Sequence, residues 1–334
     1  MTALVPFFDG HNDFLLRLMK SPAPREETWL GATGAGHLGL ARVKASGFAG
    51  GLFAIFVPPA SSGLPPDFEA LMADPPYALP TPMFHAEAQT DALAMAGLLH
   101  WMARAALASG AIAGVMHMEG AEAIGPDFDA LYLFNEMGLR SLGPVWSRPT
   151  IFGHGVPMAL PGRPDTGPGL TERGRDLVRL CDDLGILIDL SHLNERGCDD
   201  VAEVSAAPLV AAHSNAHALC DSPRNLTDRQ LHMIRERGGM VGFSFATFYL
   251  NADGTAASDT GRDVMLRHLD HLIEQAGEDH VGLGSDFDRC VLPDLIGDVT
   301  GLPLFFEAMA AHGYDDARIA RLARETCLPA SRAA

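Results

Sequence analysis

Eight short apolar runs recur along the chain, and most are followed by a segment with helical character. The runs are almost continuously apolar and do not alternate with polar residues, which is typical of strands buried on both faces of a parallel sheet. They cover residues 5–8, 50–57, 111–118, 139–145, 185–190, 208–212, 239–245 and 280–284. Because parallel neighbours need long crossover connections, this pattern predicts an α/β fold.

Helical patterns fill the gaps between these runs. They cover residues 14–20, 37–47, 87–109, 126–137, 171–184, 195–205, 227–237, 261–276, 301–312 and 315–326. Thr171 and Thr227 are good N-cap residues for two of these helices, and Gln230 completes a capping-box pattern with Thr227. Pro and Gly punctuate residues 21–36, where we expect a loop.

Eight strand–helix units predict a (β/α)₈ TIM barrel, forming a single domain over residues 1–334. An open, doubly wound sheet is the alternative. The barrel is favoured because polar residues follow so many of the strands, and a closed barrel gathers them around one mouth. No glycine-rich phosphate loop supports a nucleotide-binding sheet. Residues 58–85, approximately, are rich in Pro and predict an irregular loop insertion, a candidate lid.

Composition excludes several classes of partner. The chain is 47% hydrophobic and 20% charged, and no apolar run reaches the ~18 residues of a membrane-spanning helix. A net charge of −18 argues against nucleic acid and anionic membranes as partners. The five scattered cysteines contain no CxxC pair, which is typical of reduced thiols. No signal-peptide pattern precedes the first run, so we expect a cytoplasmic protein.

Side chains of metal-ligand type follow five of the eight runs. They are His11, Asp13, Glu119, His192, His213 and Asp286. Residues two apart in an extended segment point to the same side, so His11 and Asp13 can reach one ion. Taken singly, each residue has an ordinary structural explanation, such as a loop hydrogen bond or a helix cap. Those explanations do not predict that all of them follow strands at the same end, whereas a divalent metal site does.

Two metal ions are favoured over one. A pair of ions a few ångströms apart needs a bridging ligand, which in barrel hydrolases is a carboxylate or a carbamylated lysine. The two lysines, Lys20 and Lys44, both lie outside the strand ends, so Glu119 is the candidate bridge. A hydroxide shared by the two cations would then be the nucleophile.

Several motifs, spread in order over nearly the whole chain, resemble the membrane dipeptidase (renal dipeptidase) family of zinc metallopeptidases. The motifs are Asp9-Gly10-His11-Asn12-Asp13, Met118-Glu119-Gly120, Asp189-Leu190-Ser191-His192, Ala212-His213-Ser214, Pro223-Arg224-Asn225-Leu226, Gly238-Gly239-Met240-Val241-Gly242 and Gly282-Leu283-Gly284-Ser285-Asp286-Phe287-Asp288. The resemblance implies a barrel of the metal-dependent hydrolase type, in a bacterial cytoplasmic-type member of the family.

The resemblance also implies roles for these residues. His11 and Asp13 would hold one zinc ion, His192 and His213 the other, and Glu119 would bridge them. Asp286 would bind the substrate amino group and donate a proton to the leaving amine, with Asp288 as the weaker candidate for that role. Arg224 would bind the substrate's terminal carboxylate, which suits a planar bidentate donor. Without the motif, Arg224 would be read as a surface residue paired with an aspartate.

One position departs from the family pattern. The family usually has a Thr-His pair after the fourth strand, whose His stabilises the oxyanion at the scissile carbonyl, but this chain has Val145-Trp146. The Trp146 indole donates one N–H and is bulkier than imidazole. Either His154 takes the place of the missing imidazole, or the substrate does not need it.

The predicted function is therefore hydrolysis of small dipeptides, with a D-residue tolerated at the C-terminal position, by a binuclear zinc enzyme. A related metal-dependent amidohydrolase acting on a non-dipeptide amide or a lactone is the alternative, motivated by Trp146. A non-catalytic ligand-binding barrel is a third reading, against which the complete ligand set argues. The family suggests a homodimer.

Overall fold

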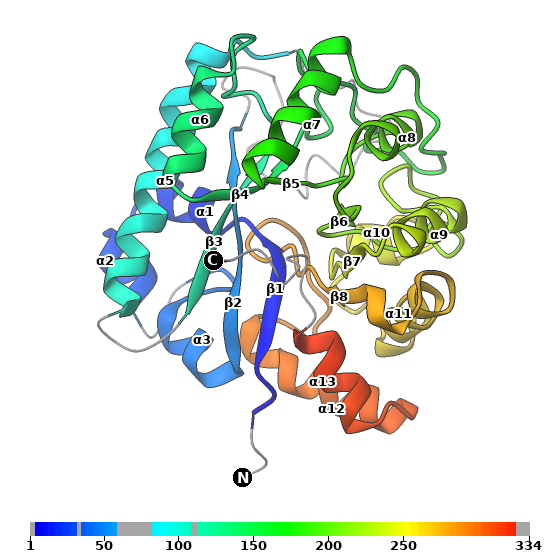
Figure 1. The fold of residues 1–334 in the computed structure, drawn as a ribbon. Coiled ribbons are helices and arrows are strands. Elements are labelled where there is room, and N and C mark those ends of the chain that lie inside the picture. The colour runs from blue at the N-terminus through cyan, green and yellow to red at the C-terminus, as the bar shows by residue number, and fades with distance from the viewer. Residues whose placement is uncertain (1–3, 32–34, 59–81, 108–111, 325–334) are drawn as a thin grey trace.

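The computed structural model describes residues 4–31, 35–58, 82–107 and 112–324. Eight parallel strands run through the centre of the molecule, and helices surround them (Figure 1). The strands are β1 (Phe7–Asn12), β2 (Phe48–Phe56), β3 (Ala113–Glu119), β4 (Leu139–Gly143), β5 (Leu187–Ile188), β6 (Val210–Ala211), β7 (Met240–Phe243) and β8 (Val281–Leu283). Each overlaps or adjoins one of the apolar runs of the sequence.

The strands form a barrel. Their order is β5-β4-β3-β2-β1-β8-β7-β6, so the two edge strands are neighbours in sequence. A parallel bridge between Asp189 and Val210 joins these edges, and the Leu190 amide donates to the Val210 carbonyl at 2.7 Å. The ring of strands is thereby nearly closed. This confirms the predicted (β/α)₈ barrel over the open doubly wound sheet.

The helices occupy the predicted gaps. They are α1 (Phe14–Lys20), α2 (Arg25–Leu30), α3 (Leu40–Ser46), α5 (His85–Leu107), α6 (Asp129–Glu136), α7 (Glu172–Leu184), α8 (Glu195–Val204), α9 (Asp228–Glu236), α10 (Thr247–Leu250), α11 (Arg262–Ala276), α12 (Leu302–His312) and α13 (Asp316–Arg324), with 3₁₀ turns η1 (Glu278–His280) and η2 (Val299–Gly301). The Thr171 hydroxyl accepts from the Gly174 amide, and Thr227 forms the predicted capping box with Gln230.

The loop predicted over residues 21–36 is wrong in part, because α2 forms within it. Pro24 is the N-cap residue of this helix, where its missing N–H costs no helical hydrogen bond. Trp29 is 1% exposed and packs against Phe14 with ring centroids 5.1 Å apart. Burial of one large aromatic side chain thus stabilises a six-residue helix that local sequence does not indicate.

The core has two parts. The larger cluster lies between the strands and the surrounding helices. The smaller one contains Leu52, Leu187, Val210, Ala212 and Met240. These residues come from β2, β5 and β7 and from β6 and its end, strands that are not all neighbours, so their side chains meet inside the barrel. These side chains form a packed layer inside the barrel.

Most of the predicted insertion at about 58–85 lies outside the described residues. The single domain over residues 1–334 therefore stays a prediction. Among the helices of the described ranges, none has both the length and the apolar composition that crossing a bilayer requires.

Candidate metal centre and substrate pocket

The first strand delivers two of the predicted ligands to the barrel mouth. His11 and Asp13 are 0% and 1% exposed, and His11 Nε2 lies 3.4 Å from Asp13 Oδ2. The Asp13 amide donates to the Phe287 carbonyl at 2.8 Å, which ties the end of β1 to the loop after β8. The two side chains therefore face one point, as the extended spacing predicts.

Glu119, the last residue of β3, lies between two groups of side chains. Its Oε2 is 3.7 Å from His11 Nε2. Its Oε1 is 2.9 Å from His192 Nε2 and 3.5 Å from His213 Nε2. Each carboxylate oxygen thus faces a different set of histidines, which is the arrangement a bridging ligand needs.

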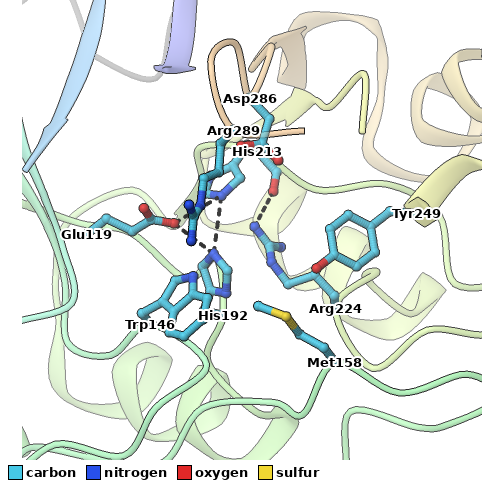
Figure 2. Close-up of a pocket in the computed structure, with 9 residues that line it drawn as sticks. All are labelled: Glu119, Trp146, Met158, His192, His213, Arg224, Tyr249, Asp286 and Arg289. Atoms are coloured by element: carbon cyan, nitrogen blue, oxygen red, sulfur yellow. Dashed lines mark hydrogen bonds and ion pairs between the residues drawn. The ribbon is translucent and has the colours of Figure 1, made fainter. Parts of the chain in front are cut away.

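His192 and His213 complete the second set. Their Nε2 atoms are 3.3 Å apart (Figure 2). The Ser147 hydroxyl lies 3.2 Å from His192 Nδ1. Burial lowers the pKa of both histidines well below its usual value. Both rings are therefore neutral at neutral pH, and a neutral imidazole has the lone pair that a metal requires.

Several buried atoms of this cluster make no hydrogen bond within the described part of the chain. They are both ring nitrogens of His11, both carboxylate oxygens of Asp13 and Nδ1 of His213. Buried polar atoms are normally hydrogen-bonded, so such a group calls for an explanation. His11, Glu119 and His213 each offer a ligand atom within 4.8 Å of the others, and so do His11, Asp13 and Asp286. The donor set fits a divalent cation that accepts imidazole and carboxylate ligands.

Electrostatics also favour a cation here. Burial raises the pKa of Glu119 to about 8, although His11 opposes the shift. Burial would lower the pKa of His11, but the carboxylates of Glu119 and Asp13 raise it to about 10. At neutral pH these raised pKa values favour a proton on both His11 and Glu119, and these protons offset the negative charge of the buried carboxylates. A metal ion would displace them on binding.

Two residues of the site have left-handed backbone conformations. His192 has φ 70° and Asp286 has φ 62°. Non-glycine residues in this region cost on the order of 1 kcal/mol or more and are common at functional sites, where the surrounding structure holds them. Here the two conformations occur four residues after β5 and three residues after β8, in the loops at the barrel mouth.

A pocket of about 290 Å³ opens beside the cluster (Figure 2). It is lined by Glu119, Trp146, Met158, His192, His213, Arg224, Tyr249, Asp286 and Arg289. Concave sites lined by a few convergent polar groups are the usual form of a ligand site. The structure therefore brings four predicted residues of the metal site, together with Trp146 and Arg224, to one cavity.

Arg224 is fixed at the pocket wall and is not a surface residue. It is 4% exposed, Nη1 donates to the Ser214 hydroxyl at 2.8 Å, and Nη2 donates to the His213 carbonyl at 2.7 Å. Its guanidinium also lies over the Tyr249 ring, 5.8 Å from the centroid. A rigidly held guanidinium is suited to binding an anionic group of a ligand.

Two of the sequence candidates do not line this pocket. His154 has Nδ1 3.2 Å from the Gly169 carbonyl. Asp288 pairs with Arg17 at 3.0 Å, and its amide donates to His37 Nδ1 at 2.8 Å. Asp288 therefore joins the loop after β8 to α1 and to the segment before α3.

Sequence reasoning did not predict Met158, Tyr249 and Arg289 as pocket residues. Met158 lies in the long connection between β4 and α7, and Tyr249 lies on α10. Arg289 carries the one usable signal, since it follows Asp286 by three residues in the loop after β8. Loops after barrel strands commonly supply ligand-binding residues.

A family model described as "Membrane dipeptidase (Peptidase family M19)" matches residues 1–334. The chain belongs to the membrane dipeptidase family. This confirms the resemblance found in the motifs and the predicted class of enzyme, a metallo-dipeptidase.

Solved and curated proteins are similar to this chain. A metallo peptidase from Rhodobacter sphaeroides, liganded with a phosphinate mimic of the dipeptide L-Ala-D-Ala, is 57% identical, with a TM-score of 0.92 over 96% of this chain and 97% of that one. An uncharacterized protein in the PQQ-III 3′ region of Acinetobacter calcoaceticus is 39% identical over 81% of this chain and 90% of its own. Dipeptidase tcpJ of Claviceps purpurea is 30% identical over 64% of this chain and 49% of its own length.

Proposed function

We propose that this member of the membrane dipeptidase family is a binuclear zinc dipeptidase. His11 and Asp13 would hold one zinc ion, His192 and His213 the other, and Glu119 would bridge them. The observation that carries this proposal is the position of Glu119, whose two oxygens face different histidines. Zinc ions bound there would polarise the scissile carbonyl and activate the attacking water.

We propose that the substrate is a dipeptide, with a D-residue accepted at the C-terminal position. The pocket is small, and it has an arginine and a carboxylate, Arg224 and Asp286, for the two charged ends of a dipeptide. The Rhodobacter sphaeroides relative binds a mimic of L-Ala-D-Ala, which supports this substrate class. Arg224 would bind the terminal carboxylate through a charge-assisted pair.

Asp286 would bind the substrate amino group and pass a proton to the leaving amine. Burial raises the pKa of Asp286 above its usual range, although His11 opposes the shift. A raised pKa favours the protonated form of a carboxyl group, which is the form that a general acid requires. We assign this role to Asp286 and not to Asp288, because Asp288 is engaged by Arg17 and His37.

Trp146 is our candidate for the group beside the scissile carbonyl. Its ring centroid is 5.9 Å from that of His192, and it lines the pocket, whereas His154 does not. An N–H donor at this position would stabilise the oxyanion that develops during hydrolysis.

The experiment is a chelation and reconstitution assay. Chelated protein should not hydrolyse L-Ala-D-Ala and should regain activity with zinc, and Asp286→Asn should be strongly impaired. Asp263→Asn is the matched control, since Asp263 has a side chain 88% exposed on α11. Full activity of the metal-free protein would contradict the proposal. Hydrolysis of N-acyl amino acids or lactones in place of dipeptides would favour the related amidohydrolase.

We also propose a cytoplasmic, homodimeric protein. Light scattering on the purified protein should give twice the 35.5 kDa mass of the chain. A monomer mass at micromolar concentration would contradict the dimer.

A further inference from the structure

His192 and His213, the two histidines proposed to hold one zinc ion, come from opposite sides of the junction between β5 and β6. These strands are the two edges of the sheet, and an isolated bridge between Asp189 and Val210 joins them. His192 lies four residues after the end of β5, and His213 lies two residues after the end of β6. Backbone pairing of the two strands therefore does little to fix the distance between the two imidazoles.

Side chains hold the two segments together beyond this bridge. Asp189 Oδ1 accepts from the Ala212 amide at 2.8 Å and from the Ser191 amide at 3.0 Å. The Ser191 hydroxyl accepts from the His213 amide at 3.2 Å. The amides of two consecutive residues after β6 are thus bonded to side chains of the segment that carries His192.

The same carboxylate also faces the strand that ends in Glu119. Asp189 Oδ2 lies 3.5 Å from Nε2 of His117, a buried residue of β3. His117 precedes Glu119 by two residues, so the two side chains lie on the same side of β3. One buried carboxylate therefore contacts all three of the segments that supply Glu119, His192 and His213.

Asp189 acts on these ligands and not on the substrate. It is buried and is not among the residues that line the pocket. Its two amide partners, Ser191 and Ala212, are next to His192 and His213 in the chain, so bonds at these amides limit how far each imidazole can move. Groups that orient metal ligands from outside the ligand set commonly control metal affinity.

We propose that Asp189 is a positioning residue that holds His192 and His213 at the spacing that one of the two zinc ions requires. This inference rests on the proposed binuclear zinc centre and deepens it by naming a residue outside the ligand set that controls zinc affinity. Loss of Asp189 weakens zinc binding. It leaves the KM for the dipeptide close to the wild-type value once zinc is saturating, because Asp189 does not touch the substrate.

The experiment titrates metal-free protein with zinc, buffered by a competing chelator, and measures the zinc bound per chain. Asp189→Leu keeps the approximate shape of the side chain and removes both acceptor oxygens. We expect the free zinc concentration that half-fills one of the two sites to rise about 10–100-fold, as for other groups that orient metal ligands. Asp189→Asn keeps one oxygen for the Ala212 amide and should restore most of the affinity. The KM for L-Ala-D-Ala at saturating zinc is measured for each variant.

Asp200→Leu is the matched control. Asp200 is buried and, like Asp189, accepts from a backbone amide, in this case that of Leu170 at 2.9 Å. Its ion-pair partners are Arg175 and Arg196, and these two arginines and Leu170 are not among the residues that line the pocket. This variant loses a buried carboxylate without affecting the proposed zinc ligands, so its zinc titration should match that of the wild type.

Unchanged zinc affinity in Asp189→Leu would overturn the inference, as would an equal loss in Asp200→Leu or a raised KM that persists at saturating zinc. If Asp189→Leu does not fold, Ser191→Ala decides, because it removes only the acceptor of the His213 amide. A weakened zinc site in Ser191→Ala supports the inference, and unchanged affinity overturns it. A wild-type protein that binds fewer than two zinc ions would instead overturn the proposed binuclear centre, and the inference with it.

Discussion

Arg148 donates from both Nε and Nη2 to a single carboxylate oxygen of Glu122, at 3.0 and 2.8 Å, and both side chains are buried. The same Nη2 donates to the Val57 carbonyl at 2.9 Å. The pair therefore joins the segments that follow β2, β3 and β4. Trp146, which lines the pocket, and Ser147, which contacts His192, directly precede Arg148 in the chain. The ion pair therefore fixes one wall of the site.

Breaking this pair should destabilise the fold. Arg148→Met leaves the Glu122 carboxylate buried without its partner, and we expect a loss of about 3–5 kcal/mol in the free energy of unfolding. The double variant Arg148→Met/Glu122→Met should recover part of that loss, because it leaves no buried charge. Urea denaturation of both variants measures the difference. Equal stability of Arg148→Met and the wild type would show that the pair does not hold this wall.

Arg224→Met should impair binding of substrates that have a free terminal carboxylate. We expect kcat/KM for L-Ala-D-Ala to fall on the order of 100-fold, as for loss of a charge-assisted pair. The amide L-Ala-D-Ala-NH₂ lacks the carboxylate, so its slower hydrolysis should change far less in the same variant. Steady-state kinetics on the two substrates make this comparison. Equal losses on both would assign Arg224 to another role.

The Trp146→Phe variant distinguishes the contribution of the indole N–H from that of the aromatic ring. Phe keeps the packing against Phe56 and His192 but has no donor, and we expect kcat to fall on the order of 100-fold with little change in KM. His154→Asn serves as the comparison, since His154 is bonded to the Gly169 carbonyl. A large loss of kcat in the His154 variant with none in Trp146→Phe would assign the oxyanion contact to His154.

His268 should make stability depend on pH. Burial lowers the pKa of His268 from 6.5 to about 4, and its Nδ1 accepts from the Ala216 amide at 3.3 Å. Between these values the unfolded chain binds a proton that the folded chain does not. Stability therefore falls as the pH drops through this window, by about 2 kcal/mol from pH 7 to pH 5.

Urea denaturation of zinc-loaded wild type and His268→Gln at the two pH values tests this. The variant is expected to be less stable at pH 7 but to lose about 2 kcal/mol less than the wild type on acidification. An identical pH dependence in the two proteins would rule out His268 as the titrating group.

The barrel and the gathering of polar side chains at its mouth were predictable because they depend on short-range rules. A polar residue that directly follows a buried parallel strand must lie at the carboxyl end of the barrel, whichever helices pack outside it. His11, Glu119 and His213 obey this rule, so their positions in the sequence were sufficient. The motif that contains Arg224 likewise indicated that this arginine lies at the substrate pocket, which it lines.

The remaining pocket residues depend on loop paths that sequence patterns do not encode. Tyr249 lies on a four-residue helix, too short to produce a periodic signal, and Met158 lies in an irregular connection. The burial of Trp29 that creates α2 is likewise a tertiary effect. Asp288, the weaker candidate of its motif, contacts Arg17 and His37 and is not among the residues that line the pocket, so its role in substrate binding stays a prediction.

The most direct test of the two-metal centre is the zinc content and dipeptidase activity of Glu119→Gln. Gln has the size of Glu but only one oxygen ligand, so it cannot bridge two cations. We predict two zinc ions per chain in the active wild type, and fewer than two with negligible hydrolysis of L-Ala-D-Ala in Glu119→Gln. Glu203→Gln, at a side chain 66% exposed, should match the wild type. Full zinc content and full activity in Glu119→Gln would contradict the binuclear centre.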